Sequence, residues 1–211
     1  MTVYIPRHFS ADDPATLKSF VAANAFGTLI THHGAETTVS HIPFVVDEDA
    51  SGAVVLHGHV ARANPHWQVL EAAPALVIFS GPHGYVSPTW YEKHPSVPTW
   101  NYAVVHASGA ARLVDAAALE RTLGRLSAHY EAGNPAPWRM ESLERGYVDT
   151  MVRAIVGFEI AVKRLEGKFK LSQNRIPADQ RRVIEALEAR GEAGLAAMMR
   201  EACFPDGKET P

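Results

Sequence analysis

Cysteine is the residue that this sequence most nearly lacks. Cys203 is the only one, so no disulfide can form within a chain and a reducing compartment is expected. No apolar run approaches the roughly 20 residues that cross a bilayer as a helix. The N-terminal stretch MTVYIPRHFSADDP also lacks the apolar centre of a signal peptide. Together these absences predict a soluble, cytoplasmic protein.

An excess of charge of one sign is missing as well. The 211 residues include 20 Lys and Arg against 23 Asp and Glu, which gives a formal net charge of -3. Such a chain has no overall attraction for nucleic acid, so contact with DNA would require a local basic patch or a partner. The sequence contains no glycine-rich dinucleotide fingerprint, P-loop, GxSxG nucleophile motif, HExxH or CxxC. No short motif therefore indicates dinucleotide binding, P-loop phosphate binding, a serine nucleophile or a zinc site.

The hydrophobic share of 46% is enough for a substantial core, and its pattern is mostly that of strands. Asp12-Asp13-Pro14 marks the start of a helix. Three strand-like segments then follow one another, separated only by turns: 26–31, 37–46 and 54–60. Consecutive strands that do not alternate with helices predict an antiparallel barrel or sandwich with peripheral helices, which is a mainly β fold with some α (α+β).

The second half of the chain shows the same pattern with longer interruptions. An apolar run at 75–80 is expected to stop at Gly81-Pro82, ahead of a long loop rich in aromatic, hydroxyl and proline residues. Two strands are expected on either side of Gly109, and Asp115 is expected to cap the next helix. A β-branched run at 155–162 is typical of a buried strand.

The last part of the chain has helical character. The segment 177–202 is rich in Ala, Leu and charged residues, and Gly191 and Gly194 are expected to weaken or divide the helix there. We therefore expect a barrel domain over 1–175 and a helical extension over 176–211 that packs on the same domain or on a partner.

Arg62 is the first candidate binding residue. It follows a strand, and the small residues Ala61 and Ala63 beside it let backbone amides approach a ligand. Asn64 before Pro65 fits the cap of a short helix. The planar guanidinium suits a phosphate, and amides at the helix start would add donors. A surface arginine at a helix start explains the same pattern.

Histidines form a second candidate group, since the chain has 11 of them. His57 and His59 alternate along one strand and share a face. Metal sites use such pairs, with His41, His83 or His106 as a third ligand. No acidic residue or cysteine stands nearby at ligand spacing, so histidines that line a polar pocket explain the pattern better than a closed metal site.

Two further stretches combine groups that binding sites use. The aromatic loop carries Trp and Tyr rings that suit either a planar heterocycle or a packed contact, and Ser87, Thr99 and Asn101 supply polar partners among them. Later in the chain, 164–175 concentrates cations that could meet a phosphate or a carboxylate, followed by the amides of Gln173 and Asn174. On the residues alone, a solvated basic segment before a helix explains that second stretch better.

These stretches together resemble one family, the PaiB-type FMN-binding negative transcriptional regulators. The resemblance runs in order along nearly the whole chain and is carried by five blocks: YIPRHF (4–9), HGHVARANPHW (57–67), GPHGYVSPTWY (81–91), VPTWNYAVVHASG (97–109) and RLEGKFKLSQNR (164–175). Family members often have Trp where this chain has Phe169, which should not abolish flavin binding.

The resemblance implies a split β-barrel flavoprotein, similar to pyridoxamine-phosphate oxidases and usually a homodimer with FMN at the subunit interface. It places Arg62 and Asn64 at the flavin phosphate, with His59 nearby, and His41 and Pro43 along the ring. Further FMN contacts are implied, some from the second subunit, in the segments that close the site: Ser87, Thr99, Trp100, Asn101, Lys168, Lys170, Ser172, Gln173 and Asn174.

The resemblance implies a regulatory role, but no helix-turn-helix or basic helix face that would contact DNA is visible. The alternative is an enzyme, either a flavin-dependent oxidoreductase or an NAD(P)H-dependent flavin reductase, in which the cofactor supplies the redox chemistry. No dedicated acid or base stands out for it, although His83, Tyr85 and Tyr91 are suited to face the ring. A haem or metal in the histidine-rich pocket is the third reading.

Overall fold

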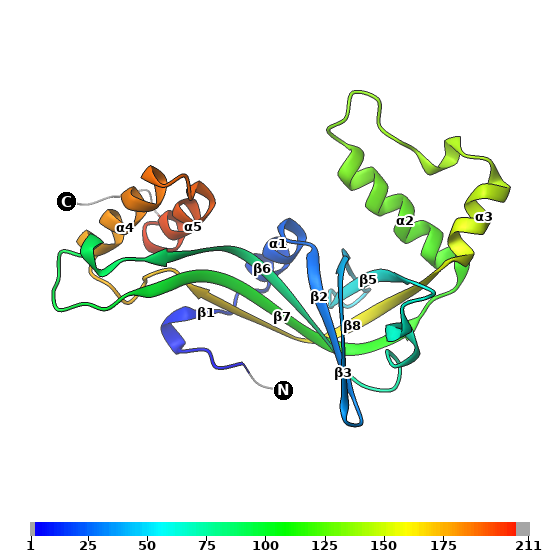
Figure 1. The fold of residues 1–211 in the computed structure, drawn as a ribbon, viewed down its shortest axis with the longest axis horizontal. Helices are drawn as coiled ribbons and strands as arrows, with labels where there is room; N and C mark the ends of the chain where they lie inside the picture. The colour runs from blue at the N-terminus through cyan, green and yellow to red at the C-terminus, as the bar shows by residue number, and fades with distance from the viewer. Residues whose placement is uncertain (1–2, 206–211) are drawn as a thin grey trace. The chain divides into compact units, whose positions relative to one another are not determined.

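The computed structural model describes residues 3–205, so the last residues of the expected C-terminal extension, 206–211, lie outside the described residues (Figure 1). The described chain forms five α-helices: α1 (Pro14–Ala23), α2 (Ala116–Glu131), α3 (Arg145–Arg153), α4 (Pro177–Ala189) and α5 (Ala193–Cys203). Its strands are β1 (Ser10–Ala11), β2 (Phe26–His33), β3 (Glu36–Pro43), β4 (Val45–Glu48), β5 (Val54–Ala61), β6 (Ala75–Val86), β7 (Thr99–Leu113) and β8 (Ile155–Lys170). Four 3-10 helices complete it: η1 (Arg7–Phe9), η2 (Pro65–Gln68), η3 (Pro88–Trp90) and η4 (Met140–Ser142).

The strands form one sheet in the order β3-β2-β6-β7-β8-β5-β4, and β1 pairs with β8. The pairs β2–β3, β2–β6, β4–β5, β5–β8 and β1–β8 are all antiparallel. No parallel pairing with crossover helices is needed for such a sheet, because short turns connect antiparallel neighbours. The prediction of a mainly antiparallel β fold with helices is confirmed.

Two compact units divide the described residues, and three long strands, β6, β7 and β8, contribute to both. The central unit comprises Lys18–Phe79 and His106–Leu165. The terminal unit comprises Ser80–Val105 and the described parts of Met1–Leu17 and Glu166–Pro211.

Three phenylalanines, Phe44, Phe79 and Phe158, form the aromatic core of the central unit. The Phe44 ring lies edge-on to both others, with centroid distances of 5.6 Å to Phe79 and 6.2 Å to Phe158. All three are at most 2% exposed, and burying rings of this size supplies much of the hydrophobic stabilisation of a core. Gly58 lies on β5 where a side chain would meet the Phe158 ring, since an added Cβ would be 2.9 Å from it.

The terminal unit is built around α4 and α5, drawn in orange and red in Figure 1. Their apolar faces bury Val183, Leu187 and Leu195 against Val86 and Leu171. Pro177 begins α4, and Gly191, with φ of +80°, allows the chain to turn between the two helices. The predicted division of the C-terminal helical segment is therefore confirmed.

Three predicted strand ends were wrong. β6 continues through Gly81-Pro82 to Val86, and β7 runs unbroken through Gly109. The α5 helix covers the extended part of β6, where an added Cβ on Gly84 would lie 2.9 Å from Leu195 Cδ2. A glycine or proline read in isolation indicates a break, but here packing favours the strand.

The third wrong end concerns the basic stretch. β8 does not end at Val162 but runs on to Lys170, where β1 pairs with it in the register Ser10↔Lys168. A smaller difference is the predicted strand 37–46, which divides at the buried Phe44 into β3 and β4. The amide of Phe44 donates to the carbonyl of Ala25 at 2.9 Å instead of to a strand partner.

Candidate functional site

The predicted phosphate ligand Arg62 lies in the central unit, just after β5 ends. Its side chain is exposed, and Nε donates to the carbonyl of Arg153 at 2.7 Å while Nη2 donates to that of Ile155 at 3.0 Å. The carbonyl of Arg62 in turn accepts from Trp67 Nε1 at 3.0 Å. The guanidinium therefore joins its loop to the end of α3 and the start of β8. A guanidinium has about five N–H groups, so further donors remain for an anion.

A buried polar network fixes the loop that carries Arg62. His66 is 0% exposed; hydrogen bonds join its Nδ1 to Ser40 Oγ at 2.8 Å and its Nε2 to Thr31 Oγ1 at 3.1 Å. Asn64 donates from Nδ2 to Ser40 Oγ at 3.0 Å and accepts from the amide of His66 at 3.0 Å. Asn64 thus caps η2 as predicted, and both its side-chain nitrogen and its side-chain oxygen are hydrogen-bonded within the chain.

The remaining candidates of the central unit lie on β3 and β5. His41 is exposed, and a hydrogen bond of 3.1 Å joins its Nδ1 to Thr28 Oγ1 on the neighbouring strand. Pro43 is half-buried and opposes Phe26 in the β2–β3 pair. Burial lowers the pKa of half-buried His59 below its usual 6.5, so its imidazole is neutral at physiological pH, with one ring nitrogen able to donate a hydrogen bond and the other able to accept one.

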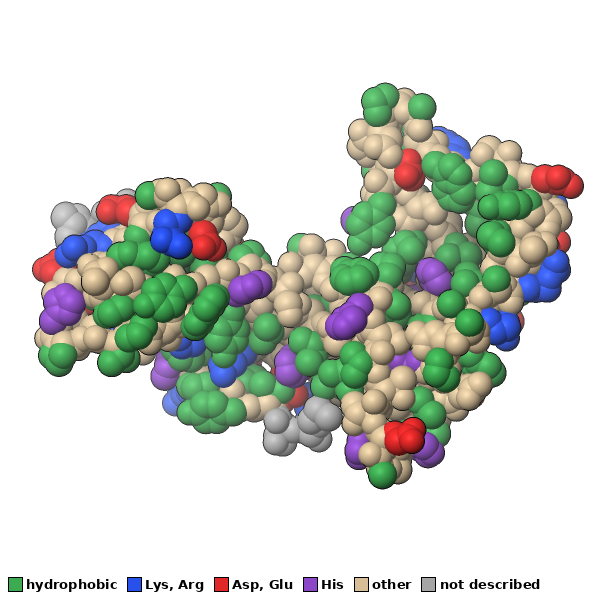
Figure 2. Space-filling model, in the orientation of Figure 1, with side chains coloured by type: hydrophobic (Ala, Val, Ile, Leu, Met, Phe, Trp, Pro, Cys, Tyr) green, Lys and Arg blue, Asp and Glu red, His purple; other side chains and the backbone are tan. Residues whose placement is uncertain are grey.

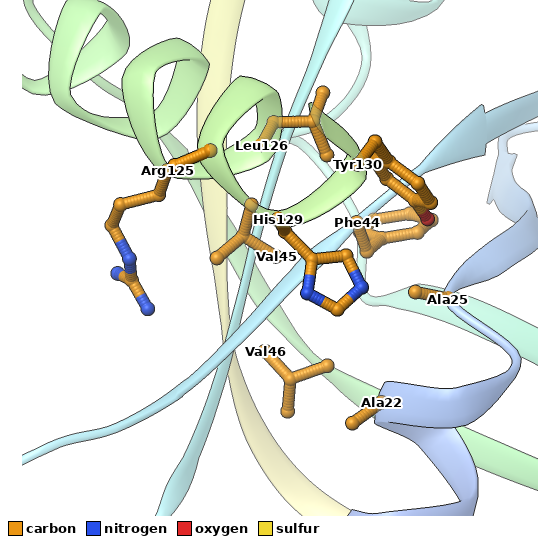
Figure 3. Close-up of a pocket in the computed structure, with 10 residues that line it drawn as sticks. Ala22, Ala25, Phe44, Val45, Val46, Arg125, Leu126, His129 and Tyr130 are labelled. Carbon is orange, nitrogen blue, oxygen red and sulfur yellow. The ribbon is translucent and has the colours of Figure 1, made fainter. Parts of the chain in front are cut away.

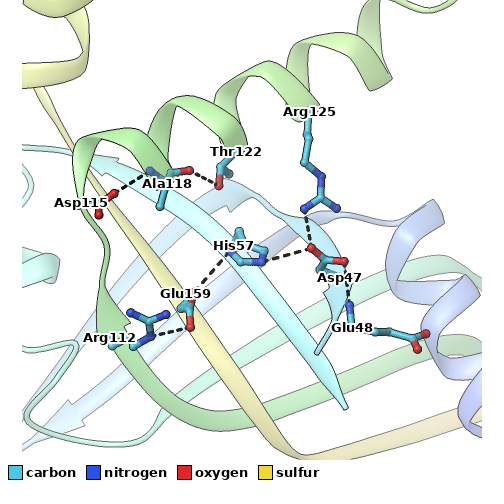
Figure 4. Close-up of polar contacts among 9 residues, drawn as sticks. All are labelled: Asp47, Glu48, His57, Arg112, Asp115, Ala118, Thr122, Arg125 and Glu159. Atoms are coloured by element: carbon cyan, nitrogen blue, oxygen red, sulfur yellow. Dashed lines mark hydrogen bonds and ion pairs between the residues drawn. The ribbon is translucent and has the colours of Figure 1, made fainter. Parts of the chain in front are cut away.

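Two carboxylates flank His57, but its pKa does not favour the charged form that an ion pair would need (Figure 4). Its Nε2 lies 3.7 Å from Asp47 Oδ2, and its Nδ1 lies 3.9 Å from Glu159 Oε2. Burial lowers the pKa of His57 more than those carboxylates raise it. Each carboxylate has its own arginine at 2.6 Å, Arg125 for Asp47 and Arg112 for Glu159. The network holds α2 and β7 to β4, β5 and β8 without requiring a charged histidine.

In the terminal unit, five of the predicted site residues line one small pocket. Lys170 Nζ donates to Thr99 Oγ1 and, at 2.6 Å, to the carbonyl of Trp100. Asn101, which is 1% exposed, donates from Nδ2 to Ser172 Oγ at 2.9 Å. Thr99, Asn101, Lys170, Ser172 and Asn174 all line a cavity of about 130 Å³. The fold thus brings residues of the 98–101 and 168–174 segments together, and their contact with FMN stays a prediction.

Three further candidates serve other contacts in the terminal unit. Lys168 donates to the carbonyl of Tyr4 at 2.9 Å, with its Nζ 5.3 Å from the centroid of the Tyr4 ring. Gln173 accepts from the amide of Leu171 at 2.8 Å and donates to the carbonyl of Phe169 at 2.6 Å, so its amide shapes the turn after β8. Ser87 accepts from the amide of Thr89 at 3.2 Å and caps η3. Their roles toward FMN remain predictions.

Two features of the site regions lie outside the residues that the resemblance assigned to FMN. Arg175 and Tyr91 line the same small pocket as Lys170, and only the long-range fold brings Tyr91 there. A second, larger cavity of about 350 Å³ lies in the central unit (Figure 3). Its lining comes from α1, the β3–β4 junction and α2, and includes Phe44, His129 and Tyr130. No pattern in the sequence marked that cavity.

Residues 3–205 contain neither a cluster of metal-ligating side chains nor a helix that could cross a membrane. Among residues 3–205, no group of three or more His, Cys, Asp or Glu side chains is placed to hold a metal ion. None of the helices formed by these residues is long and apolar enough to cross a membrane.

Comparison with known proteins identifies the family. The family described as "Putative FMN-binding domain" matches residues 3–164. The chain is 34% identical over 187 residues to "Protease synthase and sporulation protein PAI 2" of Bacillus subtilis, which covers 88% of this chain and 89% of that protein. An uncharacterised protein of Emericella nidulans is 36% identical over 202 residues, 77% of this chain and 80% of its own. The chain therefore belongs to this family of FMN-binding domains, and the resemblance to PaiB-type proteins is confirmed.

Solved structures show the same fold at low sequence identity. The flavocytochrome Anf3 from Azotobacter vinelandii matches with a TM-score of 0.61 and 16% identity, covering 79% of this chain and 72% of that one. An FAD- and haem-binding protein from Mycobacterium smegmatis matches with a TM-score of 0.60 and 16% identity, over 77% and 73% of the two chains. The predicted split-barrel fold is thus confirmed, and membership of the family of FMN-binding domains makes FMN the cofactor of this chain.

Proposed function

We propose that the chain binds FMN with its phosphate at Arg62, and that the buried network beneath this loop holds the guanidinium in place. The observation that carries the proposal is the network of His66, Ser40, Thr31 and Asn64, which fixes the loop that presents the solvent-exposed Arg62. A guanidinium with unused N–H groups fits a phosphate dianion. Binding needs little ordering of such a loop, and preorganisation of this kind lowers the entropic cost of binding.

His41, Pro43 and His59 are proposed to line the flavin ring from β3 and β5. They belong to the same unit as Arg62, and a neutral imidazole can serve either a ring carbonyl or a ring nitrogen. When bound, FMN supplies redox chemistry that no side chain of this chain provides. The residues of the chain contribute binding, orientation and exclusion of water.

The proposal is tested by comparing FMN with riboflavin, which lacks the phosphate. Arg62→Ala and Arg62→Gln are expected to weaken FMN binding about 10- to 100-fold, or about 1.4–2.8 kcal/mol, and to leave riboflavin binding unchanged. Gln retains an N–H donor for the carbonyls of Arg153 and Ile155 but loses the charge. Flavin fluorescence titration gives both dissociation constants.

A matched control is Arg145→Ala, since Arg145 is an exposed arginine of the same unit that pairs with Glu120 at 2.8 Å. It removes the same charge and should leave both affinities unchanged. Equal weakening of FMN and riboflavin by Arg62→Gln would show that the arginine supports the fold and does not bind the phosphate.

We also infer that the chain acts as a homodimer, as the family resemblance implies. Hydrophobic side chains, shown in green in Figure 2, gather over α2, α3 and the loop between them. In this region Tyr147 is 55% exposed and Trp138 45% exposed, and apolar surface of this kind marks interaction sites.

Light scattering should give a mass of two chains for the wild type, and the double substitution Tyr147→Ser with Trp138→Ser should shift the mass toward that of one chain. Val97→Ser, at a residue of the terminal unit that is 69% exposed, is the control; a monomeric wild type contradicts the inference.

A further inference from the structure

The small pocket of the terminal unit, here called the Lys170 pocket, contains more positive charge than the fold neutralises. It has a volume of about 130 Å³, and two of its lining residues, Lys170 and Arg175, are cationic. The volume suits a phosphate or a short carboxylate and is too small for a flavin ring system. Its polar walls are the hydroxyl and amide side chains of Tyr91, Thr99, Ser172 and Asn174.

Neither cation is neutralised by a carboxylate of the described chain. Lys170 donates to Thr99 Oγ1 and to the carbonyl of Trp100, which are both uncharged. Arg175 lies with its Cζ 4.1 Å from the centroid of the Tyr91 ring, and its Nη1 donates to Ser96 Oγ at 3.3 Å. Among residues 3–205, neither side chain forms an ion pair. Burial first, and then the charges of Lys168 and Arg175, lower the pKa of Lys170, so the cations act on one another.

A carboxylate, that of Asp179, does lie near Tyr91, and within residues 3–205 only one of its two oxygens, Oδ1, has hydrogen-bond partners. Asp179 is fully buried, and its Oδ1 accepts from the amides of Glu92 at 2.7 Å and Lys93 at 3.2 Å. Two backbone N–H donors stabilise an ionised carboxylate strongly. Asp179 does not line the pocket, so the only charged side chains among the lining residues are the cations Lys170 and Arg175.

Tyr91 points to a ligand independently of the charges. Its side chain is 2% exposed, and its buried hydroxyl has no hydrogen-bond partner within residues 3–205. Burial raises the pKa of Tyr91 above its usual 10.0, although Arg175 opposes the shift, so the hydroxyl stays protonated and can donate. Buried polar groups almost always find a partner, and an acceptor in the pocket would provide one.

Ser172 supplies a second hydroxyl donor. Its φ of +67° is rare for a residue with a side chain. The Ser172 Oγ accepts from Asn101 Nδ2 at 2.9 Å, which leaves the hydroxyl hydrogen itself free to donate. Unusual backbone conformations of this kind concentrate at ligand sites.

We propose that the Lys170 pocket is a binding site for a small oxyanion, a phosphate or carboxylate group. Lys170 and Arg175 supply the charge, and Tyr91 and Ser172 donate from their hydroxyls. The oxyanion that occupies the pocket is either a free anion or the phosphate group of FMN. The second case rests on the proposed function, and in it the residues of the Lys170 pocket, not Arg62, would bind the FMN phosphate.

The first experiment titrates inorganic phosphate into the full chain without flavin and follows binding by calorimetry at constant ionic strength. We expect Lys170→Met to weaken phosphate binding about 10-fold or more and Tyr91→Phe about three- to tenfold, because each removes a donor to the anion. Tyr91→Phe should not lower the melting temperature, since the hydroxyl has no partner in the fold. Lys163→Met removes the same charge from an exposed residue that does not line the pocket, and it should weaken binding less than threefold.

The second experiment repeats the titration with acetate, FMN and riboflavin. Unchanged FMN affinity in Lys170→Met assigns the site to a free anion, whereas weaker FMN with unchanged riboflavin assigns it to the flavin phosphate. Both results uphold the oxyanion site, and only the second contradicts Arg62 as the phosphate ligand. Absence of phosphate binding to the wild type, or equal phosphate affinity in the wild type and Lys170→Met or Tyr91→Phe, overturns the proposal whether or not FMN binds.

Discussion

Replacement of Gly109 by alanine is expected to prevent stable folding of the chain. An added Cβ at Gly109 would lie 2.0 Å from the carbonyl oxygen of Ala161 and 3.0 Å from Val162 Cα, both backbone atoms of β8. Backbone inside a sheet cannot move aside without loss of its hydrogen bonds, unlike the end of a flexible side chain. Such a clash costs more than about 4–5 kcal/mol, which approaches the whole stability of many domains of about 5–15 kcal/mol. Thermal unfolding of the purified variant measures the effect.

The matched control is Gly124→Ala in α2. Nothing lies within 4 Å of an added Cβ there, so the substitution should raise stability by about 0.5–1 kcal/mol through better helix propensity. Both variants add one methyl group to a glycine of the central unit. A Gly109→Ala protein that melts within a few degrees of the wild type would mean that β7 and β8 do not approach as closely as described.

Gly109 also shows where sequence reasoning succeeds and where it fails. Local chemistry predicted the start of α1 at Pro14 and the caps at Asn64 and Asp115 correctly, because a cap depends on residues within one turn. A glycine in a strand-like run does not reveal whether the chain turns or another backbone approaches. At Gly109 the approaching backbone is that of Ala161 on β8, which is far away in the sequence. The strand therefore continues through the glycine.

The candidate site shows a related limit. The resemblance identifies polar residues in the right segments, but polar residues also satisfy the fold itself. The amides of Asn64 and Gln173 are occupied by backbone and side-chain partners within the chain. By contrast, the Tyr91 hydroxyl and the Lys170 ammonium, which have no hydrogen-bond partner and no ion-pair partner respectively within residues 3–205, appear as available groups only once distant segments are folded together. Which polar groups remain available for a ligand is a property of the tertiary structure.

Replacement of His66 by alanine is expected to lower the free energy of unfolding by about 2–4 kcal/mol at pH 7.5. His66 is fully buried, and its removal leaves the hydroxyls of Ser40 and Thr31 without their imidazole partner and creates a cavity. The loop with Arg62 loses its support, so FMN should bind more weakly while riboflavin is affected less. His41→Ala, at an exposed histidine with one hydrogen bond to Thr28, is the control and should cost less than about 1 kcal/mol.

The cost of the His66 substitution should itself depend on pH. Burial lowers the pKa of folded His66 below the usual 6.5, so between the two values the unfolded chain binds a proton that the folded chain does not. Acid therefore stabilises the unfolded state relative to the folded state. The stability that neutral His66 contributes is complete above pH 6.5, the pKa of the unfolded chain, and is lost as the pH falls through the lower pKa of the folded chain. Urea unfolding at pH 7.5 and pH 5.5 should therefore show the gap between wild type and His66→Ala narrowing in acid. His57 and His59 remain in both proteins, so their own titration cancels from the comparison. An equal difference in the free energy of unfolding at both pH values would mean that His66 has the same protonation in the folded and unfolded chains. That result would contradict a buried neutral imidazole beneath Arg62.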